Sequence, residues 1–139
     1  MNDNLVDILL VEDNPTDAAL SMRVLKKFAA AERIHLARDG AEALDFLKTG
    51  GRPPHLILLD LKLPKVDGLE VLRRMKTDPD LCSLPVVIFT SSNQPKDVRD
   101  CYRLGANSYI VKPVDYERFT QAVQYIVSYW LSLNHPPEA

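Results

Sequence analysis

The sequence predicts an α/β fold in which a parallel β-sheet is covered by helices on both faces. Short apolar runs alternate five times with longer segments of helical periodicity, the pattern of chains built from strand–helix units. Most of these runs are apolar throughout, which is typical of strands buried on both faces. A length of 139 residues suits one hydrophobic core. We therefore expect a single domain over residues 1–139, with a core at about 5–133 and a C-terminal tail at 134–139.

The expected strands are short apolar runs beside turn residues or charged residues. The four strongest are Ile8–Val11, Leu56–Leu59, Val86–Phe89 and Tyr109–Val111. A fifth run, Arg33–Ala37, alternates apolar and polar residues. Alternation indicates that one face of the strand is exposed, so we expect this run at an edge of the sheet.

The segments between the strands carry helix start and stop signals. Asn14 followed by Pro15 is a favoured start, because Asn caps a helix and proline is tolerated at the first helical position. Gly105 is a typical residue just after a helix end. The five helices are expected to begin at Pro15, Gly40, about Gly68, Pro95 and about Asp115, and the last extends toward Leu133.

Composition and charge exclude several classes of protein. Seventeen basic residues against nineteen acidic ones leave a net charge of −2, which provides no positive field for direct binding of nucleic acid. No apolar run approaches the roughly 18 residues of a membrane span, and the acidic N-terminus does not resemble a secretory signal. We therefore expect a cytoplasmic protein without a membrane anchor. Cys82 and Cys101 lack C-x-x-C spacing and are expected to be unpaired.

The ends of the strong strands carry reactive side chains. Glu12 and Asp13 follow the first strand, Asp60 the third, Thr90 the fourth and Lys112 the fifth. An acidic residue after a strand is most often a solvated helix cap. In parallel α/β sheets, however, ligands bind at the carboxyl ends of the strands, and every strong strand delivers a polar group there. We therefore expect these side chains to meet in one cleft.

The charges in this cleft indicate a divalent cation and phosphoryl transfer. Two carboxylates about 4 Å apart repel by about 4 kcal/mol at an effective dielectric constant near 20. Lys112 supplies one positive charge, and Mg²⁺, which prefers oxygen ligands, would supply the rest. The absence of His and Cys from the motif argues against zinc. A carboxylate, a metal, a hydroxyl and an ammonium together suit the formation of an aspartyl phosphate.

Four motifs together resemble those of response-regulator receiver domains, the phosphoacceptor partners of sensor histidine kinases. They are Val11-Glu12-Asp13-Asn14, Asp60-Leu61-Lys62-Leu63-Pro64 with Asp67-Gly68, Thr90-Ser91, and Lys112-Pro113. The likeness covers Ile8 to Ile126, and the positions of Thr90 and Lys112 relative to Asp60 match the family. The resemblance implies a flavodoxin-like (βα)5 fold, doubly wound, with strand order 2-1-3-4-5.

The resemblance also implies a role for each motif residue. Asp60 would be the phosphorylation site, and Thr90 and Lys112 would contact the phosphoryl group. The ligands of Mg²⁺ would be Asp13, Asp60, the Lys62 backbone carbonyl and, largely through water, Glu12.

A conformational switch is implied as well. Tyr109 matches the family's switch aromatic, which turns inward when Thr90 moves toward the phosphoryl group; the alternative is a half-buried strand tyrosine. The Lys112–Pro113 peptide is expected to be cis. The signalling surface would consist of the fourth helix, the fifth strand and the fifth helix.

The fifth helix is apolar around most of its circumference. Phe119, Val123, Ile126 and Trp130 recur at helical spacing, as expected for packing on a sheet. A dimer interface is expected at four residues, Tyr125, Tyr129, Trp130 and Leu133. The alternative is a helix packed back on its own core under the C-terminal tail. The ending around Tyr129-Trp130-Leu131 resembles stand-alone receivers paired with phytochrome-type kinases, which tend to be homodimers.

Three other functions are disfavoured. A phosphatase of the haloacid dehalogenase type needs an acid two residues after its nucleophile, where this chain has Lys62. A flavin or nucleotide module would need a glycine-rich loop after the first strand, and none is present. A receiver-like module that is never phosphorylated would not require the intact set of Asp60, Thr90 and Lys112. We expect a stand-alone response regulator with no output domain, which is not a conventional enzyme.

Overall fold

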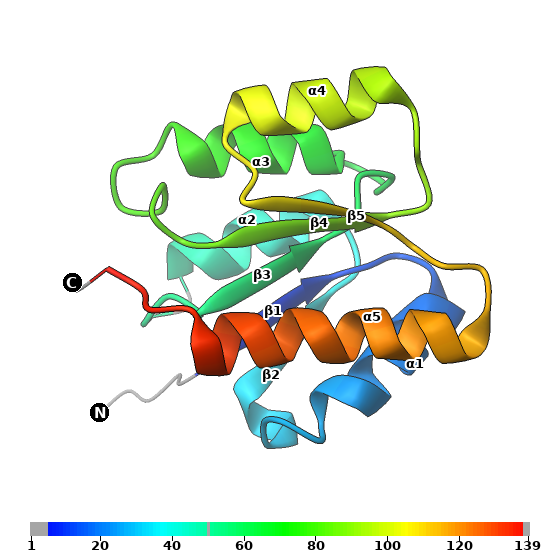
Figure 1. Cartoon of the computed structure of the whole chain (residues 1–139). Helices are drawn as coiled ribbons and strands as arrows, with labels where there is room; N and C mark the ends of the chain where they lie inside the picture. The colour runs from blue at the N-terminus through cyan, green and yellow to red at the C-terminus, as the bar shows by residue number, and fades with distance from the viewer. Residues whose placement is uncertain (1–5, 50, 138–139) are drawn as a thin grey trace.

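The computed structural model describes residues 6–49 and 51–137. Residue 5 of the expected core and residues 138–139 of the expected tail lie outside these ranges. The strands are β1 Ile8–Val11, β2 Ile34–Ala37, β3 Leu56–Leu59, β4 Val86–Thr90 and β5 Ser108–Val111. The α-helices are α1 Pro15–Leu25, α2 Gly40–Thr49, α3 Gly68–Lys76, α4 Pro95–Leu104 and α5 Tyr116–Ser128. All strand pairs are parallel, in the order β2-β1-β3-β4-β5 (Figure 1). The predicted fold class and strand order are confirmed.

The helices form two layers, one on each face of the sheet (Figure 1). Alternate strand residues point to opposite faces, so Leu9 and Val11 pack in the cluster with α2, α3 and α4. Ile8 and Leu10 belong to the other cluster, with α1 and α5. Because both faces of the central strands are covered, their sequences are apolar without alternation. The two edge strands differ. β2 has two half-buried positions, and the edge position predicted for it is confirmed. β5 lies at the other edge with three half-buried positions and one exposed position, so the burial on both faces predicted for Tyr109–Val111 is wrong.

Backbone hydrogen bonds hold the carboxyl ends of the strands together. The amide of Asp60 donates to the carbonyl of Val11 at 3.1 Å, and the amide of Glu12 donates to that of Ala37 at 3.0 Å. The residues that follow β1 and β3 are therefore fixed side by side, and β4 lies next to β3. The polar side chains that follow these strands therefore lie together at one edge of the sheet.

Helix ends follow the predicted signals. The side chain of Asn14 accepts hydrogen bonds from the amides of Thr16 and Asp17, and Pro15 is the first residue of α1. Gly105 closes α4 with φ of 107°, a left-handed conformation that glycine adopts without strain.

Four elements differ in extent or form from the predicted ones. β4 extends one residue further, to Thr90, and β5 begins one residue earlier, at Ser108. Arg33 belongs to a short 3₁₀ turn, Ala31–Arg33, so β2 begins one residue later than expected. The last helix is α-helical to Ser128 and continues as a π-helical turn over Tyr129–Leu133. Across the described residues, none of the helices is both long and apolar enough to cross a membrane.

Candidate functional site

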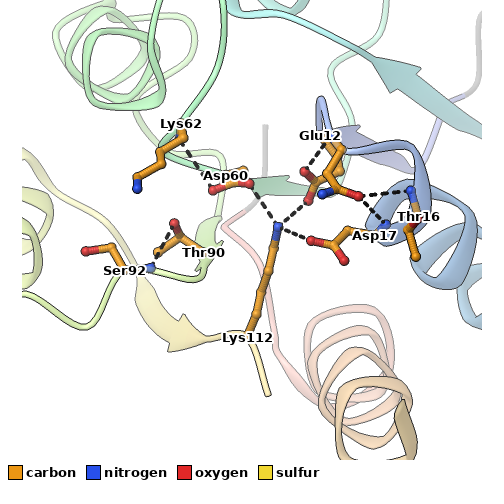
Figure 2. Close-up of polar contacts among 9 residues, drawn as sticks. Glu12, Thr16, Asp17, Asp60, Lys62, Thr90, Ser92 and Lys112 are labelled. Atoms are coloured by element: carbon orange, nitrogen blue, oxygen red, sulfur yellow. Dashed lines mark hydrogen bonds and ion pairs between the residues drawn. The ribbon is translucent and has the colours of Figure 1, made fainter. Parts of the chain in front are cut away.

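A single ammonium group connects three carboxylates at the edge of the sheet. The Nζ of Lys112 lies 2.8 Å from Oε1 of Glu12, 2.8 Å from Oδ2 of Asp17 and 2.9 Å from Oδ2 of Asp60. Figure 2 shows these contacts spreading from Lys112 to the ends of β1 and β3 and to the first turn of α1. The predicted convergence of Glu12, Asp60 and Lys112 is therefore present.

The side chains at the centre of this cluster are almost completely buried. Glu12, Asp60 and Lys112 are 2%, 8% and 8% exposed. Burial raises the pKa of Glu12 to about 7, and the charge of Asp60 adds to this, while the hydrogen bond from Lys112 opposes it. Burial by itself would lower the pKa of Lys112, but its bonds to Asp17, Glu12 and Asp60 outweigh burial and raise the pKa. Lys112 is therefore charged at neutral pH.

The loop after β3 carries Asp60 and packs against the first residue of α3, Gly68. The amide of Lys62 donates to Oδ1 of Asp60 at 3.4 Å. The amide of Gly68 donates to the carbonyl of Leu61 at 2.9 Å. A β-carbon at position 68 would lie only 2.1 Å from the Asp60 carbonyl oxygen. The Asp67-Gly68 pair is thus a packing requirement of this loop, with Asp67 as the cap of α3.

The other side of the cleft is formed by the end of β4 and the loop that follows it. Thr90 is 1% exposed, and its carbonyl accepts a 2.7 Å hydrogen bond from the amide of Lys112. Tyr109, half-buried on β5, donates its hydroxyl hydrogen bond to the Ser92 carbonyl at 2.8 Å. The Ser92 hydroxyl in turn contacts Oδ2 of Asp97 at 2.5 Å. The predicted switch residues are therefore linked through the loop between β4 and α4.

The oxygen donors at this edge suit a hard divalent cation such as Mg²⁺ or Mn²⁺. Asp13 is exposed beside buried Glu12, and within the described residues the acidic partners of Lys112 do not include it. No three His, Cys, Asp or Glu side chains form a ready-made metal cage in residues 6–49 and 51–137. Mg²⁺ does not require one, because one or two carboxylates, a carbonyl and several waters complete its shell.

One expectation drawn from the resemblance is wrong. The described residues contain no cis peptide bond, so Lys112–Pro113 is trans. Proline narrows the preference for the trans isomer to about 0.5–1 kcal/mol without reversing it, and this chain has the ordinary isomer.

Asp17 is a member of the cluster that the sequence analysis missed. It lies in the first turn of α1, where acidic residues are common because they interact favourably with the helix dipole. The only signal in the sequence was its position one turn after Asn14 and Pro15, close to the end of β1. That position does not show whether the carboxylate only stabilises the helix or also forms an ion pair with Lys112.

Three of the four residues expected at a dimer interface, Tyr125, Tyr129 and Trp130, line a groove between α5 and β5, whereas Leu133 is not among its lining residues. Tyr125, Tyr129 and Leu133 are 68%, 47% and 74% exposed. Trp130 is partly buried and packs against the α1–α5 side of the core. The groove has a volume of about 530 Å³ and is lined by Tyr125, Tyr129, Trp130, Asn107, Ser108, Ile110, Ala122 and Ile126. The predicted packing of α5 on the sheet is confirmed by buried Phe119, Val123 and Ile126.

Comparison with known proteins relates this geometry to a family. The model of the response regulator receiver domain matches residues 8–124. The chain is 45% identical over 134 residues to a probable methanogenesis regulatory protein, FilR2, of Methanothrix harundinacea, covering 94% of this chain and 86% of the relative. It is 42% identical over 137 residues to the response regulator Rcp1 of Synechocystis, covering 95% and 93%.

Solved structures show the same similarity in three dimensions. The phosphorylated cyanobacterial phytochrome response regulator RcpA superposes with a TM-score of 0.90 at 38% identity, over 96% of this chain and 99% of that one. The Mn²⁺-bound form of Rcp1 superposes with a TM-score of 0.87 at 40% identity, over 96% and 99%. The matching motifs, fold and sheet edge have one explanation: this chain belongs to the response regulator receiver domains, the signalling modules of two-component systems.

Proposed function

We propose that this response regulator receiver domain accepts a phosphoryl group on Asp60. The observation that carries the proposal is the ammonium of Lys112, which lies 2.9 Å from the Asp60 carboxylate in an almost dry cleft. A fixed positive charge beside a buried carboxylate is suited to stabilise charge that develops during phosphoryl transfer. Thr90, buried at the end of the neighbouring strand, supplies a hydroxyl for the same group.

The proposed reaction exchanges one bond to phosphorus for another. An Asp60 carboxylate oxygen attacks the phosphorus of a phosphohistidine, the P–N bond breaks, and the released imidazole takes up a proton. Asp13, Asp60, the Lys62 carbonyl and, through water, Glu12 would hold Mg²⁺, which neutralises charge on the carboxylate and the phosphoryl oxygens. Hydrolysis reverses the modification: water attacks phosphorus, the P–O bond to Asp60 breaks, and inorganic phosphate leaves. Catalysis is confined to the protein's own modification.

Intact mass spectrometry tests the site. Wild-type protein incubated with acetyl phosphate and Mg²⁺ is expected to gain one phosphoryl group, and Asp60→Asn is expected to gain none. Asp45→Asn, which changes an exposed carboxylate on α2, is the matched control and should be labelled like wild type. An unchanged wild-type mass with acetyl phosphate and with a phosphorylated histidine kinase would refute the proposal and favour a constitutive binding module.

The α4–β5–α5 face is the proposed output surface. Tyr109 on β5 is hydrogen-bonded to the loop after Thr90, so a movement of Thr90 toward a phosphoryl group would disturb this contact directly. The new charge then shifts the population between two conformations of this face.

Self-association through the α5 groove is the proposed mode of dimerisation. Among the described residues, none of those lining the groove is acidic, basic or histidine. Two copies related by a two-fold axis bring the same patch together, and a neutral patch does so without repulsion between like charges. We expect a dimer at tens of micromolar in light-scattering measurements. Tyr125→Asp, which changes an exposed residue of the groove, should disrupt it, whereas Tyr102→Asp, which changes an exposed residue of α4, should not. A wild-type monomer under these conditions would contradict the proposal.

A phytochrome-type histidine kinase is the proposed phosphoryl donor. The support is the similarity to RcpA, whose structure is described as a phytochrome response regulator. The donor role places the protein in the cytoplasm with the kinase domain, and no direct contact with nucleic acid or membrane is proposed. Phosphotransfer from a labelled phytochrome-type kinase should exceed transfer from an unrelated histidine kinase; equal or slower transfer would refute this pairing.

A further inference from the structure

Three carboxylates engage the Lys112 ammonium in this structure: it donates hydrogen bonds to Asp17 and Asp60, and it forms an ion pair with Glu12 at 2.8 Å. An ammonium has three N–H groups, and the three partners of Lys112 are Glu12, Asp17 and Asp60. Glu12 and Asp60 follow strands and have side chains only 3% and 10% exposed, whereas the Asp17 side chain on α1 is 23% exposed. Asp17 therefore links the Lys112 side chain to a helix at the more open side of the cleft.

Asp17 also adds negative charge close to the reacting carboxylate. Oδ2 of Asp17 and Oδ2 of Asp60 lie 2.8 and 2.9 Å from the same nitrogen, so these two oxygens are less than about 6 Å apart, well within a Debye length. Near neutral pH Glu12 is only partly ionised, so the ammonium is shared among Asp17, Asp60 and the remaining charge of Glu12. An incoming phosphoryl group, itself anionic, meets an excess of negative charge and an ammonium that is already engaged.

We propose that Asp17 is a positioning residue that restrains phosphorylation by holding Lys112 toward α1. This inference rests on the proposed phosphorylation of Asp60. The Lys112–Asp17 ion pair withholds part of the positive charge that would otherwise attract and stabilise the phosphoryl group. Without the Asp17 charge, Lys112 is engaged mainly by the Asp60 side of the cleft, and the approach of an anionic donor is easier.

The decisive variant removes the charge of Asp17 and keeps its shape. Asp17→Asn retains an oxygen that can accept a hydrogen bond from Lys112. The matched control is Glu117→Gln, which removes an exposed first-turn carboxylate from α5. The rate constant of phosphorylation by acetyl phosphate is measured by intact mass at saturating Mg²⁺. We expect Asp17→Asn to raise it roughly threefold to tenfold, with Glu117→Gln at the wild-type value.

Salt provides a readout that a purely structural role would not change. Raising ionic strength from about 0.1 M to 1 M shortens the Debye length from roughly 10 Å to 3 Å. The ratio of the Asp17→Asn rate constant to the wild-type one should therefore fall toward one. A ratio that is insensitive to salt, or a variant that is phosphorylated no faster than wild type, would overturn the inference.

Failure of this inference is distinct from failure of the proposed function. If wild type gains no phosphoryl group, the phosphorylation of Asp60 itself is refuted. If wild type is labelled and Asp17→Asn is labelled at the same rate or more slowly, only the restraining role is refuted. Should Asp17→Asn fail to fold, Asp17→Ser removes the same charge and decides the question; two unfolded variants would show a structural role and also overturn the inference.

Discussion

Replacing Gly68 by alanine should displace the loop that carries Asp60. A β-carbon at residue 68 would lie 2.1 Å from the Asp60 carbonyl oxygen and 2.6 Å from Cα of Leu61. Ordinary van der Waals contact begins at 3.4 Å, so the two backbones must separate by more than about 1 Å. Overpacking of this kind costs about 1–3 kcal/mol, and the better helix propensity of alanine offsets up to about 1 kcal/mol. Taking about 2 kcal/mol as the middle of the overpacking range, we expect a net loss of about 1–2 kcal/mol, or a Tm lower by roughly 3–7 °C for a chain of this length.

Thermal unfolding and phosphorylation rates together test this reasoning. Gly105→Ala is the matched control, because it introduces the same methyl group at φ of 107° after α4, where the left-handed conformation costs about 1–2 kcal/mol. Its nearest neighbours are side-chain atoms of Lys76, not the backbone of the site. Both variants should have a lower Tm than wild type. When the phosphorylation rate is measured about 20 °C below the Tm of each variant, only Gly68→Ala should react more slowly with acetyl phosphate than wild type. Wild-type stability and rate in Gly68→Ala would refute the packing argument.

Two further predictions concern the two thiols and Tyr109, the tyrosine of the proposed switch. Cys82 is exposed and Cys101 is buried, and burial raises the pKa of Cys101 to about 11, so only about one Cys101 in a thousand is a thiolate at pH 8. A maleimide at that pH should modify Cys82 alone in the folded protein, and rapid modification of both would contradict the described burial. Tyr109→Phe leaves the Ser92 carbonyl without its 2.8 Å partner and should lower the free energy of unfolding by about 0.5–1.5 kcal/mol, measured by urea titration. Tyr102→Phe, at a residue 51% exposed, should change it by less than about 0.5 kcal/mol; equal effects of the two substitutions would exclude a special role for the Tyr109 contact.

The main-chain architecture could be predicted because its signals are local. Burial on both faces makes β1, β3 and β4 apolar throughout, and the alternating sequence of β2 indicated its edge position. The apolar sequence of β5 did not indicate that it lies at the other edge. Asn14 with Pro15 and Gly105 marked helix ends that the structure has in the same places. The π-helical turn over Tyr129–Leu133 was not predictable, since the apolar periodicity of the last helix simply continues through it.

The candidate site was predictable only as far as strand ends determine it. The meeting of Glu12, Asp60 and Lys112 follows from parallel strands ending at one edge. The contact of Asp17 with Lys112 depends on how α1 packs beside the cleft, and the bond from Tyr109 to the Ser92 carbonyl depends on the path of a loop. No periodicity encodes such distances.

By itself, the sequence determined which residue types stand at the carboxyl ends of the strands, and with them the family and its chemistry. Only the tertiary structure decided which carboxylates bind the ammonium of Lys112, because three carboxylates from separate segments of the chain come within 2.9 Å of one nitrogen. It also decided that Trp130 is held partly against the core while Tyr125 and Leu133 remain exposed. Hydrophobic patterning acts over a few neighbouring residues, whereas charge sharing and side-chain burial depend on segments brought together by the whole fold.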